Sequence, residues 1–335
     1  MSLHVRLVNP ERLTEGIIAA IQAGESVRGT TSPNPPVGCM LIDASGNAIA
    51  HGATQPAGGA HAEAVALRKA GERARGATAI VTLEPCNHTG RTGPCAQALV
   101  DAGIAEVVYL VADPNPIAAG GAQFLREHGV SVSHMPTPVE ALEPWLTATR
   151  LGRPAVTWKY AATADGFTAA ADGTSQWITA QEAREFAHED RATRDAIIVG
   201  SGTALADQPK LTARTPDGTL YDHQPRRVVV GSRAAAGEIQ GDYECYATPQ
   251  EALQALWNSG ARDVLLEGGA SLAHSFLAAD LVDTVQAYIA PMFLGAGRGV
   301  LAGPVAETLA DARRFAPVRT MLLGKDVIFE MKRQA

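Results

Sequence analysis

His61-Ala-Glu63 and, further along, Thr82-Leu-Glu-Pro-Cys86 and Cys95 indicate how the first half of the chain folds. Apolar spacing predicts a helix over Ala62–Glu72, a buried strand over Ala79–Leu83 and a second helix near Ala96–Ala102. His61 and Glu63 then open the first helix, and Cys86 and Cys95 bracket the start of the second. We therefore expect both helix N-termini to face one point, where their dipoles favour thiolates.

These side chains have the chemistry of an open zinc site. One imidazole (His61) and two thiolates (Cys86 and Cys95) can hold Zn²⁺ and leave its fourth position free, whereas a closed structural site needs a fourth protein ligand. Glu63 lies where it can move the protons of a water molecule. Taken singly, each residue is better explained as an ordinary helix histidine or a buried thiol. Their joint order, H-x-E then P-C then C, is the signature of zinc nucleobase deaminases and predicts removal of a ring amine.

The alternation of helix and strand continues outward from this stretch. Leu13, Ile17, Ile18 and Ile21 form a helical stripe, and Val37–Ile42 and Val107–Val111 are expected strands. Residues 136–154 are rich in proline and form the predicted seam between two domains, 1–147 and 152–335. Beyond the seam, strands are expected near 155–161, 195–200, 226–231, 262–267 and 283–290, with helices near 180–191, 249–258 and 270–279. The pattern predicts an α/β fold in both halves.

Composition limits the classes of function. The chain has 335 residues with a net charge of −7, and acidic residues outnumber basic ones by 35 to 28. This balance argues against a nucleic-acid surface, and no apolar run is long enough to span a membrane. Of four cysteines, Cys39 and Cys245 are expected to be buried free thiols. With no signal peptide evident, a reducing cytoplasm fits best.

The motifs together resemble one family, the bifunctional deaminase–reductases of riboflavin biosynthesis. The resemblance rests on Thr31-Ser-Pro-Asn-Pro-Pro-Val-Gly38, the zinc motifs with their long inter-cysteine loop, and Asp113-Pro-Asn-Pro116. It continues through Ala164-Asp-Gly-Phe-Thr168, Ser175-Gln-Trp-Ile-Thr179, Thr203-Ala-Leu-Ala-Asp207, Glu267-Gly-Gly269 and Ile289-Ala-Pro291, so it covers nearly the whole chain. It implies a cytidine-deaminase-like three-layer α/β/α domain followed by a dihydrofolate-reductase-like α/β domain.

The resemblance implies two successive reactions on one small molecule. The first domain would deaminate 2,5-diamino-6-ribosylamino-4(3H)-pyrimidinone 5′-phosphate with Zn²⁺. The second would use NADPH to reduce the ribosyl group to ribityl, giving 5-amino-6-ribitylamino-uracil 5′-phosphate. A homo-oligomer is expected on the same ground. In the family motif the helix carries a second histidine, where this chain has Val65; we interpret this as altered packing or altered loop contacts, and not as lost activity.

The resemblance also implies site residues. Expected to contact NADPH are Ala161, Trp177, Thr203, Asp207, Ser232, Gly269, Ala270 and Ser271. Expected to contact substrate are Asn34, His88, Arg91, Ser175, Arg191, Leu211, Arg214 and Glu267. For His88 and Arg91, substrate contact and solvent exposure are equally good interpretations. Lys159 and Asp165 are both candidates for the proton donor of the reduction, although a core ion pair or a turn cap is the better explanation of both.

Two rival hypotheses remain at this stage. One is a deaminase of nucleic acids or free nucleosides with an unrelated second domain, which the acidic charge and the 5% aromatic content disfavour. The other is a non-catalytic protein with a structural zinc and a nucleotide-sensing second domain. Replacement of Glu63 by Gln separates it from the enzyme hypothesis, because only a catalytic site depends on that carboxylate.

Overall fold

The structure is a computed structural model that describes residues 10–88, 93–116 and 119–334. The chain divides into two compact units, residues 1–150 and 151–335. Each has its own sheet and its own buried core. The units are therefore described one at a time.

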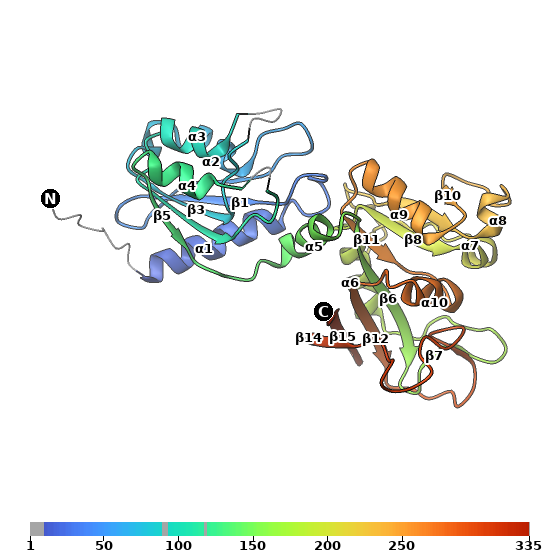
Figure 1. The fold of residues 1–335 in the computed structure, drawn as a ribbon. Coiled ribbons are helices and arrows are strands. Elements are labelled where there is room, and N and C mark those ends of the chain that lie inside the picture. The colour runs from blue at the N-terminus through green and yellow to red at the C-terminus, as the bar shows by residue number, and fades with distance from the viewer. Residues whose placement is uncertain (1–9, 89–92, 117–118, 335) are drawn as a thin grey trace. The chain divides into compact units, whose positions relative to one another are not determined.

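The first unit is a three-layer sandwich around a five-stranded sheet (Figure 1). The strand order is β2 (Ala48–Ala53), β1 (Gly38–Ile42), β3 (Thr78–Leu83), β4 (Glu106–Val111) and β5 (Ser131–His134). β1 is antiparallel to β2 and β3, and β3, β4 and β5 are parallel. The helices are α1 (Pro10–Glu25), α2 (Ala62–Ala70), α3 (Cys95–Asp101), α4 (Gly121–Glu127) and α5 (Glu143–Leu151), with short 3₁₀ turns η1 (Gly71–Ala74) and η2 (Glu140–Leu142).

Strand alternation explains why helices cover both faces of this sheet. Successive residues of β1 point to opposite faces, and all five are buried. Cys39 and Leu41 join the core that includes α2 and α3, whereas Met40 and Ile42 pack with Ala20 of α1. In Figure 1, α1 lies on one side of the sheet and α2, α3 and α4 on the other. A strand that is apolar on both faces therefore selects the layered fold.

Gly38 at the start of β1 permits the close approach of α1. A Cβ at this position would lie 1.9 Å from the Ala20 carbonyl oxygen and 2.6 Å from the Gly24 nitrogen, both backbone atoms that cannot move alone. We expect Gly38→Ala to destabilise the first unit by about 3 kcal/mol, the upper end for overpacking. Differential scanning calorimetry of the full chain would show this as an earlier transition. Gly202→Ala is the control, because a Cβ there meets nothing within 4 Å; an equal loss in both variants would contradict the packing argument.

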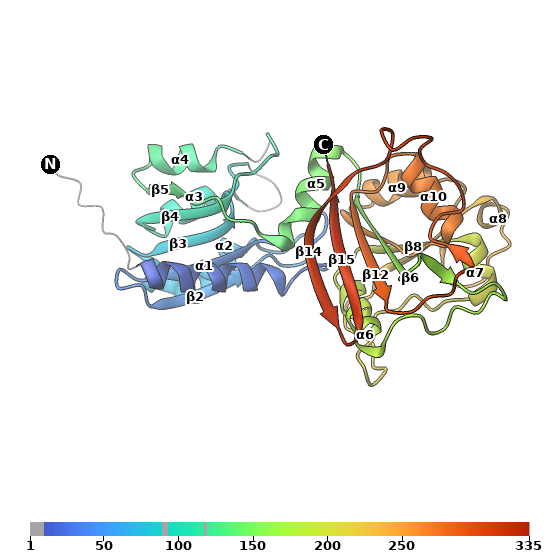
Figure 2. The ribbon, with the colours of Figure 1, turned by 90° about the horizontal axis from the view of Figure 1, so that it is seen from below.

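The second unit has an eight-stranded mixed sheet. The order is β10 (Glu244–Tyr246), β9 (Arg226–Val230), β8 (Ala196–Gly200), β11 (Asp263–Leu266), β6 (Ala155–Thr163), β12 (Thr284–Ala290), β15 (Asp326–Arg333) and β14 (Phe315–Leu323). From β10 to β12 neighbouring strands are parallel, and β15 and β14 add an antiparallel edge, which Figure 2 shows beside β12. β7 (Phe167–Ala169) and β13 (Arg298–Gly299) form a separate small ribbon.

Helices cover both faces of the second sheet. α9 (Pro249–Asn258) and α10 (Ala270–Ala278) share one core with Val156 and Trp158 of β6. α6 (Gln181–Arg191) packs by Ala183 and Ala187 on Tyr288 and Ile328, and α7 (Ser201–Asp207) and α8 (Ser232–Ala235) contribute Ala204 and Ala234 to a further cluster. Beneath α6 the buried Arg194 is paired with Asp190 and Asp263, each at 2.7 Å. This unit is thus α/β throughout, with a mostly parallel sheet.

The expected elements that carry the motifs are confirmed, and several others went unpredicted. His61 caps α2 and Cys95 opens α3, as the spacing indicated. The unpredicted elements are β2, α4, β5, β7, α7, α8, β10, β13, β14 and β15. Cys39 is buried as expected, but the expectation for Cys245 is wrong: it is exposed, because β10 is a short edge strand paired only with β9. Among the described residues, no helix is both long and apolar enough to cross a membrane.

Candidate functional sites

His61, Cys86 and Cys95 meet in the first unit, although they come from three separate segments. Their ligand atoms lie within 4.8 Å of one another. The His61 Nδ1 atom is 3.6 Å from Cys86 Sγ and 3.3 Å from Cys95 Sγ. Tetrahedral zinc bonds of ~2.0–2.1 Å to nitrogen and ~2.3 Å to sulfur would separate such atoms by about 3.6 Å. The three residues therefore fit Zn²⁺ in both donor type and spacing.

The backbone around this cluster favours thiolate. The Cys95 N–H at the start of α3 donates to Cys86 Sγ at 3.5 Å. Hydrogen bonds from Cys95 and His61 lower the pKa of the Cys86 thiol well below its ordinary value, while the hydrogen bond to Cys86 and burial raise the pKa of Cys95. A thiolate is the form that binds metal, so the segment after β3 presents its sulfur ready for coordination.

Glu63 lies in the first turn of α2, two residues after the ligand His61. Its side chain is buried, at 4% exposure, and burial, with the Cys86 charge as a second cause, raises the pKa of Glu63 to about 7. A carboxyl group with a pKa near neutrality can both accept and donate a proton. The geometry suits an acid/base residue beside the three-ligand cluster.

These residues open onto a cavity of about 240 Å³. The sequence-predicted Asn34 and His88 line it together with His61, Glu63 and Cys86, while Arg91 lies outside the described residues. The cavity is also lined by Pro33, Pro35, Val37, Thr54, Leu83, Glu84, Asp113, Asn115 and Trp145. The His88 Nδ1 atom is buried, and no hydrogen-bond partner for it is found in the described part of the chain, so it can meet a polar ligand.

Several cavity residues were not singled out from the sequence. Glu84 sits inside the T-L-E-P-C motif, and Asp113 and Asn115 belong to the D-P-N-P motif. The sequence therefore held a signal for these three. Trp145 has no such motif: it lies on α5, and its Nε1 donates to the Pro33 carbonyl at 3.0 Å. Val65 is not among the lining residues; it packs toward β2, where a Cβ on Gly52 would lie 3.0 Å from the Val65 Cβ.

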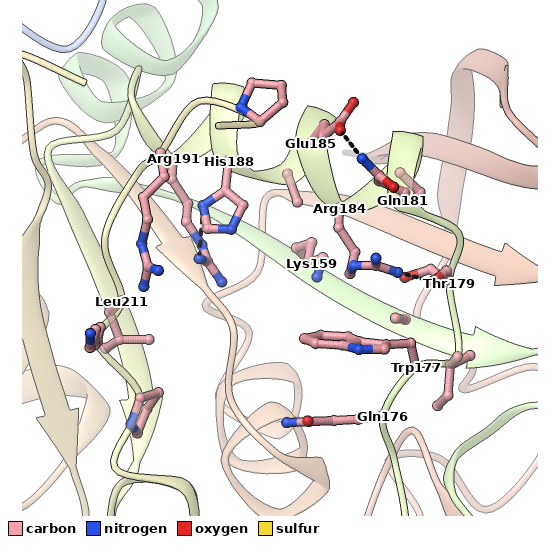
Figure 3. Close-up of a pocket in the computed structure, with 18 of the residues that line it drawn as sticks. Lys159, Gln176, Trp177, Thr179, Gln181, Arg184, Glu185, His188, Arg191 and Leu211 are labelled. Carbon is pink, nitrogen blue, oxygen red and sulfur yellow. Dashed lines mark hydrogen bonds between the residues drawn. The ribbon is translucent and has the colours of Figure 1, made fainter. Parts of the chain in front are cut away.

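The second unit contains a larger cavity, about 610 Å³, between α6, β6 and two loops (Figure 3). Six of the residues expected to contact NADPH or substrate line it, namely Ala161, Ser175, Trp177, Arg191, Leu211 and Arg214. Lys159, Arg184, His188 and Lys210 are further lining residues. The cavity thus gathers five cationic side chains with an exposed indole, which suits a flat, anionic ligand.

Arg191, which lines this cavity, forms a two-bond ion pair with Glu267. Arg191 Nε donates to Glu267 Oε1 at 2.7 Å, and Nη2 donates to Oε2 at 2.6 Å. The charge of Arg191 and its hydrogen bonds outweigh burial and lower the pKa of Glu267 to about 2. Glu267 is therefore ionised at neutral pH and fixes the guanidinium of Arg191 at the cavity wall.

The other residues expected at NADPH do not line this cavity; they lie along the carboxyl edge of the sheet. Thr203 and Asp207 are on α7, Ser232 begins α8, and Gly269, Ala270 and Ser271 form the start of α10. These helices follow β8, β9 and β11, which are neighbours in the sheet. A Cβ on Gly269 would lie 3.3 Å from Thr203 Oγ1, so two of these starts touch. Free N–H groups at helix starts suit a cofactor phosphate.

The two candidate proton donors have different surroundings. Asp165 accepts hydrogen bonds from Thr163 Oγ1, Leu294 N and Gly295 N, which is the pattern of a loop cap. Lys159 instead lines the large cavity, and its Nζ lies 5.0 Å from the centre of the Tyr288 ring. Burial lowers the pKa of Lys159, and the Glu267 carboxylate acts against this. Of the two candidates, Lys159 lines the cavity and Asp165 does not.

Each of the two units matches a known protein family. Residues 13–111 match the cytidine and deoxycytidylate deaminase zinc-binding region, and residues 154–329 match the RibD C-terminal domain. The riboflavin biosynthesis protein RibD of Corynebacterium ammoniagenes is 56% identical over 313 residues, covering 90% of this chain and 93% of that protein. RibD of Mycobacterium tuberculosis is 45% identical over 330 residues, covering 95% and 97%.

Solved structures agree over the full length. RibD of Acinetobacter baumannii matches with a TM-score of 0.83 at 33% identity, covering 97% of this chain and 99% of that one. The deaminase/reductase of Thermotoga maritima matches with a TM-score of 0.85 at 30% identity and the same coverage. The two-domain α/β fold, the zinc and NADPH cofactors and a deamination followed by a reduction are thereby established. The chain belongs to the RibD family of bifunctional deaminase–reductases of riboflavin biosynthesis.

Proposed function

We propose that residues 1–150 carry out the deamination and that His61, Cys86 and Cys95 are the zinc ligands. The observation that carries this assignment is the three-ligand cluster beside a buried glutamate at the wall of a cavity. When bound, Zn²⁺ supplies an acidified water by lowering its pKa toward ~7. No fourth protein ligand joins the cluster among the described residues, as an open catalytic site requires.

We assign the proton transfers of the deamination to Glu63. Its carboxylate accepts one proton from the attacking water and passes it to the ring nitrogen, and it then carries the second proton, from the added hydroxyl, to the amine that leaves as ammonia. A pKa of about 7 lets one group serve in both directions. Asn34 and His88 are assigned to substrate recognition, because each brings a polar group to the same cavity wall. Arg91 is kept as a substrate residue on the family resemblance alone.

The ligand assignment is tested by metal content. We expect about one zinc ion per purified wild-type chain and an at least tenfold lower content in His61→Ala, because two thiolates alone do not complete a tight site. Elemental analysis after gel filtration measures this, and His51→Ala is the control, since His51 is exposed on β2. Full zinc occupancy in His61→Ala would overturn the assignment.

We propose that the larger cavity of residues 151–335 is where the ribosyl group is reduced. The reduction replaces the C1′–O4′ bond of the sugar ring by a C–H and an O–H bond, so O4′ needs a proton donor. Lys159 is assigned to that role from its place in the cavity. Arg191 and Arg214 are assigned to the substrate phosphate, with Ser175 and Leu211 at the rest of the substrate and Glu267 holding Arg191.

NADPH, when bound, supplies the hydride. We assign its phosphates to the helix starts at Thr203, Ser232 and Gly269, with Ala270, Ser271 and Asp207 alongside. Ala161 and Trp177 line the cavity and are assigned to the ring end of the cofactor. The helix starts follow β9, β8 and β11, and Ala161 lies on β6, which is the neighbour of β11 in the sheet, so one extended molecule can reach both sets.

We also propose a cellular location, a substrate class and an oligomeric state. The four cysteines are free thiols, and two of them are assigned to zinc, which supports a cytoplasmic location. The net charge of −7 supports a small-molecule substrate rather than a nucleic acid. A homo-oligomer is supported by Val318 and Leu322, apolar side chains that are 52% and 75% exposed on the edge strand β14.

A further inference from the structure

Trp177 is the feature of the reductase cavity that most needs an explanation. Its indole is 66% exposed, whereas Trp145 and Trp158 are 8% and 4% exposed. It lies on the loop between β7 and α6, and five successive residues of that loop, 175–179, line the cavity. An exposed indole on a loop has many orientations available, so a site that uses it needs something that holds the ring.

Arg184 makes the contacts that hold this ring. Its guanidinium carbon lies 4.5 Å from the centre of the Trp177 ring. Its Nη1 atom also donates to the Thr179 carbonyl at 2.7 Å, so one side chain fixes both the indole and the backbone two residues on (Figure 3). A second anchor follows at once, because the Ala180 N–H donates to the buried Asp326 at 2.5 Å. No hydrogen bond to the Trp177 side chain is found among the described residues, so the cation is the main restraint on the ring.

The position of Arg184 is unfavourable by local rules. It lies in the first turns of α6, which begins at Gln181, and a cation near a helix N-terminus opposes the helix dipole. A residue that is unfavourable for its local structure is expected at positions where function requires it. The contact with Trp177 and Thr179 provides the reason for a cation at this point.

We propose that Arg184 is a positioning residue that holds Trp177 as one wall of the NADPH site and so sets the affinity of the reductase for its cofactor. This rests on the proposed function, in which Trp177 contacts the ring end of the cofactor. The guanidinium covers one face of the indole, which leaves the other face for a flat ring. Arg184 acts through Trp177 and does not itself touch the reacting atoms.

The test is a double-mutant cycle on the full-length protein, with NADPH binding measured by titration calorimetry. We expect Arg184→Met, which keeps the length of the side chain, to weaken NADPH binding about tenfold through loss of one ion–ring contact and one charge-assisted hydrogen bond. We expect Trp177→Ala to weaken it at least as much, and the double variant to bind like Trp177→Ala alone. Arg12→Met, an exposed helix arginine in the first unit, is the control.

A spectroscopic readout separates positioning from a loss of folding. Trp177 is the most exposed of the four tryptophans, so acrylamide quenching reports mainly on it. Arg184→Met is expected to increase quenching while ammonia release keeps its wild-type rate. A twofold or smaller change in NADPH affinity, or an effect that adds in full to that of Trp177→Ala, would overturn the inference. Unchanged NADPH binding in Trp177→Ala would instead overturn the assignment of Trp177 and the inference together.

Discussion

Glu63→Gln should lower the rate of ammonia release about 10⁴-fold, near the upper end for general acid–base catalysis, because one carboxylate serves every proton transfer. Glutamine has the same shape but cannot exchange a proton. The substitution leaves His61, Cys86 and Cys95 in place, so zinc content should stay at the wild-type level. Single-turnover ammonia release measures the loss.

Glu72 provides a matched control for the substitution of Glu63. Glu72→Gln changes an exposed glutamate in η1 of the same unit and should leave the rate unchanged. A Glu63→Gln protein that keeps its zinc and releases ammonia within tenfold of wild type would show that another group moves the protons. Loss of zinc in Glu63→Gln would mean that the carboxylate is a ligand, contrary to the assignment.

Lys159→Met should slow NADPH oxidation about 10³-fold when the deaminated intermediate is supplied, because O4′ loses its proton donor. The pH dependence of the reduction rate should also reveal this role. A donor must be protonated to act, and burial lowers the pKa of Lys159 from 10.5, so wild-type reduction should fall as the pH rises through a value below 10.5. This limb of the profile should be absent from the residual activity of Lys159→Met.

The corresponding control is Lys325→Met, an exposed lysine in the turn between β14 and β15. Its reduction rate should equal that of wild type. Deamination by Lys159→Met should also be unaffected, since the two cavities have no residue in common. If Lys159→Met reduces the intermediate at more than a tenth of the wild-type rate, the proton comes from elsewhere.

The deaminase site was predictable because its ligands lie in short motifs at the ends of regular elements. His61 and Glu63 open a helix, and Cys86 follows a strand whose carboxyl end must meet that helix in a layered fold. Trp145 could not be found in this way, because it reaches the cavity from a helix remote in sequence. Its position depends on packing and on the hydrogen bond to Pro33.

The reductase site was predictable only in part. Family resemblance named Trp177 and Thr203 together, but it did not show that one lines the cavity and the other lies along the sheet edge. That distinction depends on the strand order β9-β8-β11-β6. Parallel strands are joined by long crossover connections, so the order of strands in the sequence does not determine which strands become neighbours. Arg184 carried no motif signal, since its role depends on a contact with a loop.

The unpredicted strands share weak local signals. β2 reads Ala-Ile-Ala-His-Gly-Ala, with few residues of high β propensity, and is held by pairing with β1. β14 is an edge strand of mixed burial that contains Pro317. In both, the sheet neighbour rather than the local sequence determines the conformation.

The most direct test of two active sites acting in sequence follows ammonia release and NADPH absorbance together in one reaction. With wild-type protein, the diaminopyrimidinone phosphate and NADPH, the account predicts one NADPH oxidised for each ammonia released, with ammonia appearing first. Glu63→Gln should give neither signal until the deaminated intermediate is added, and should then oxidise NADPH at the wild-type rate. NADPH oxidation by Glu63→Gln on the undeaminated substrate, or none on the intermediate, would contradict the account.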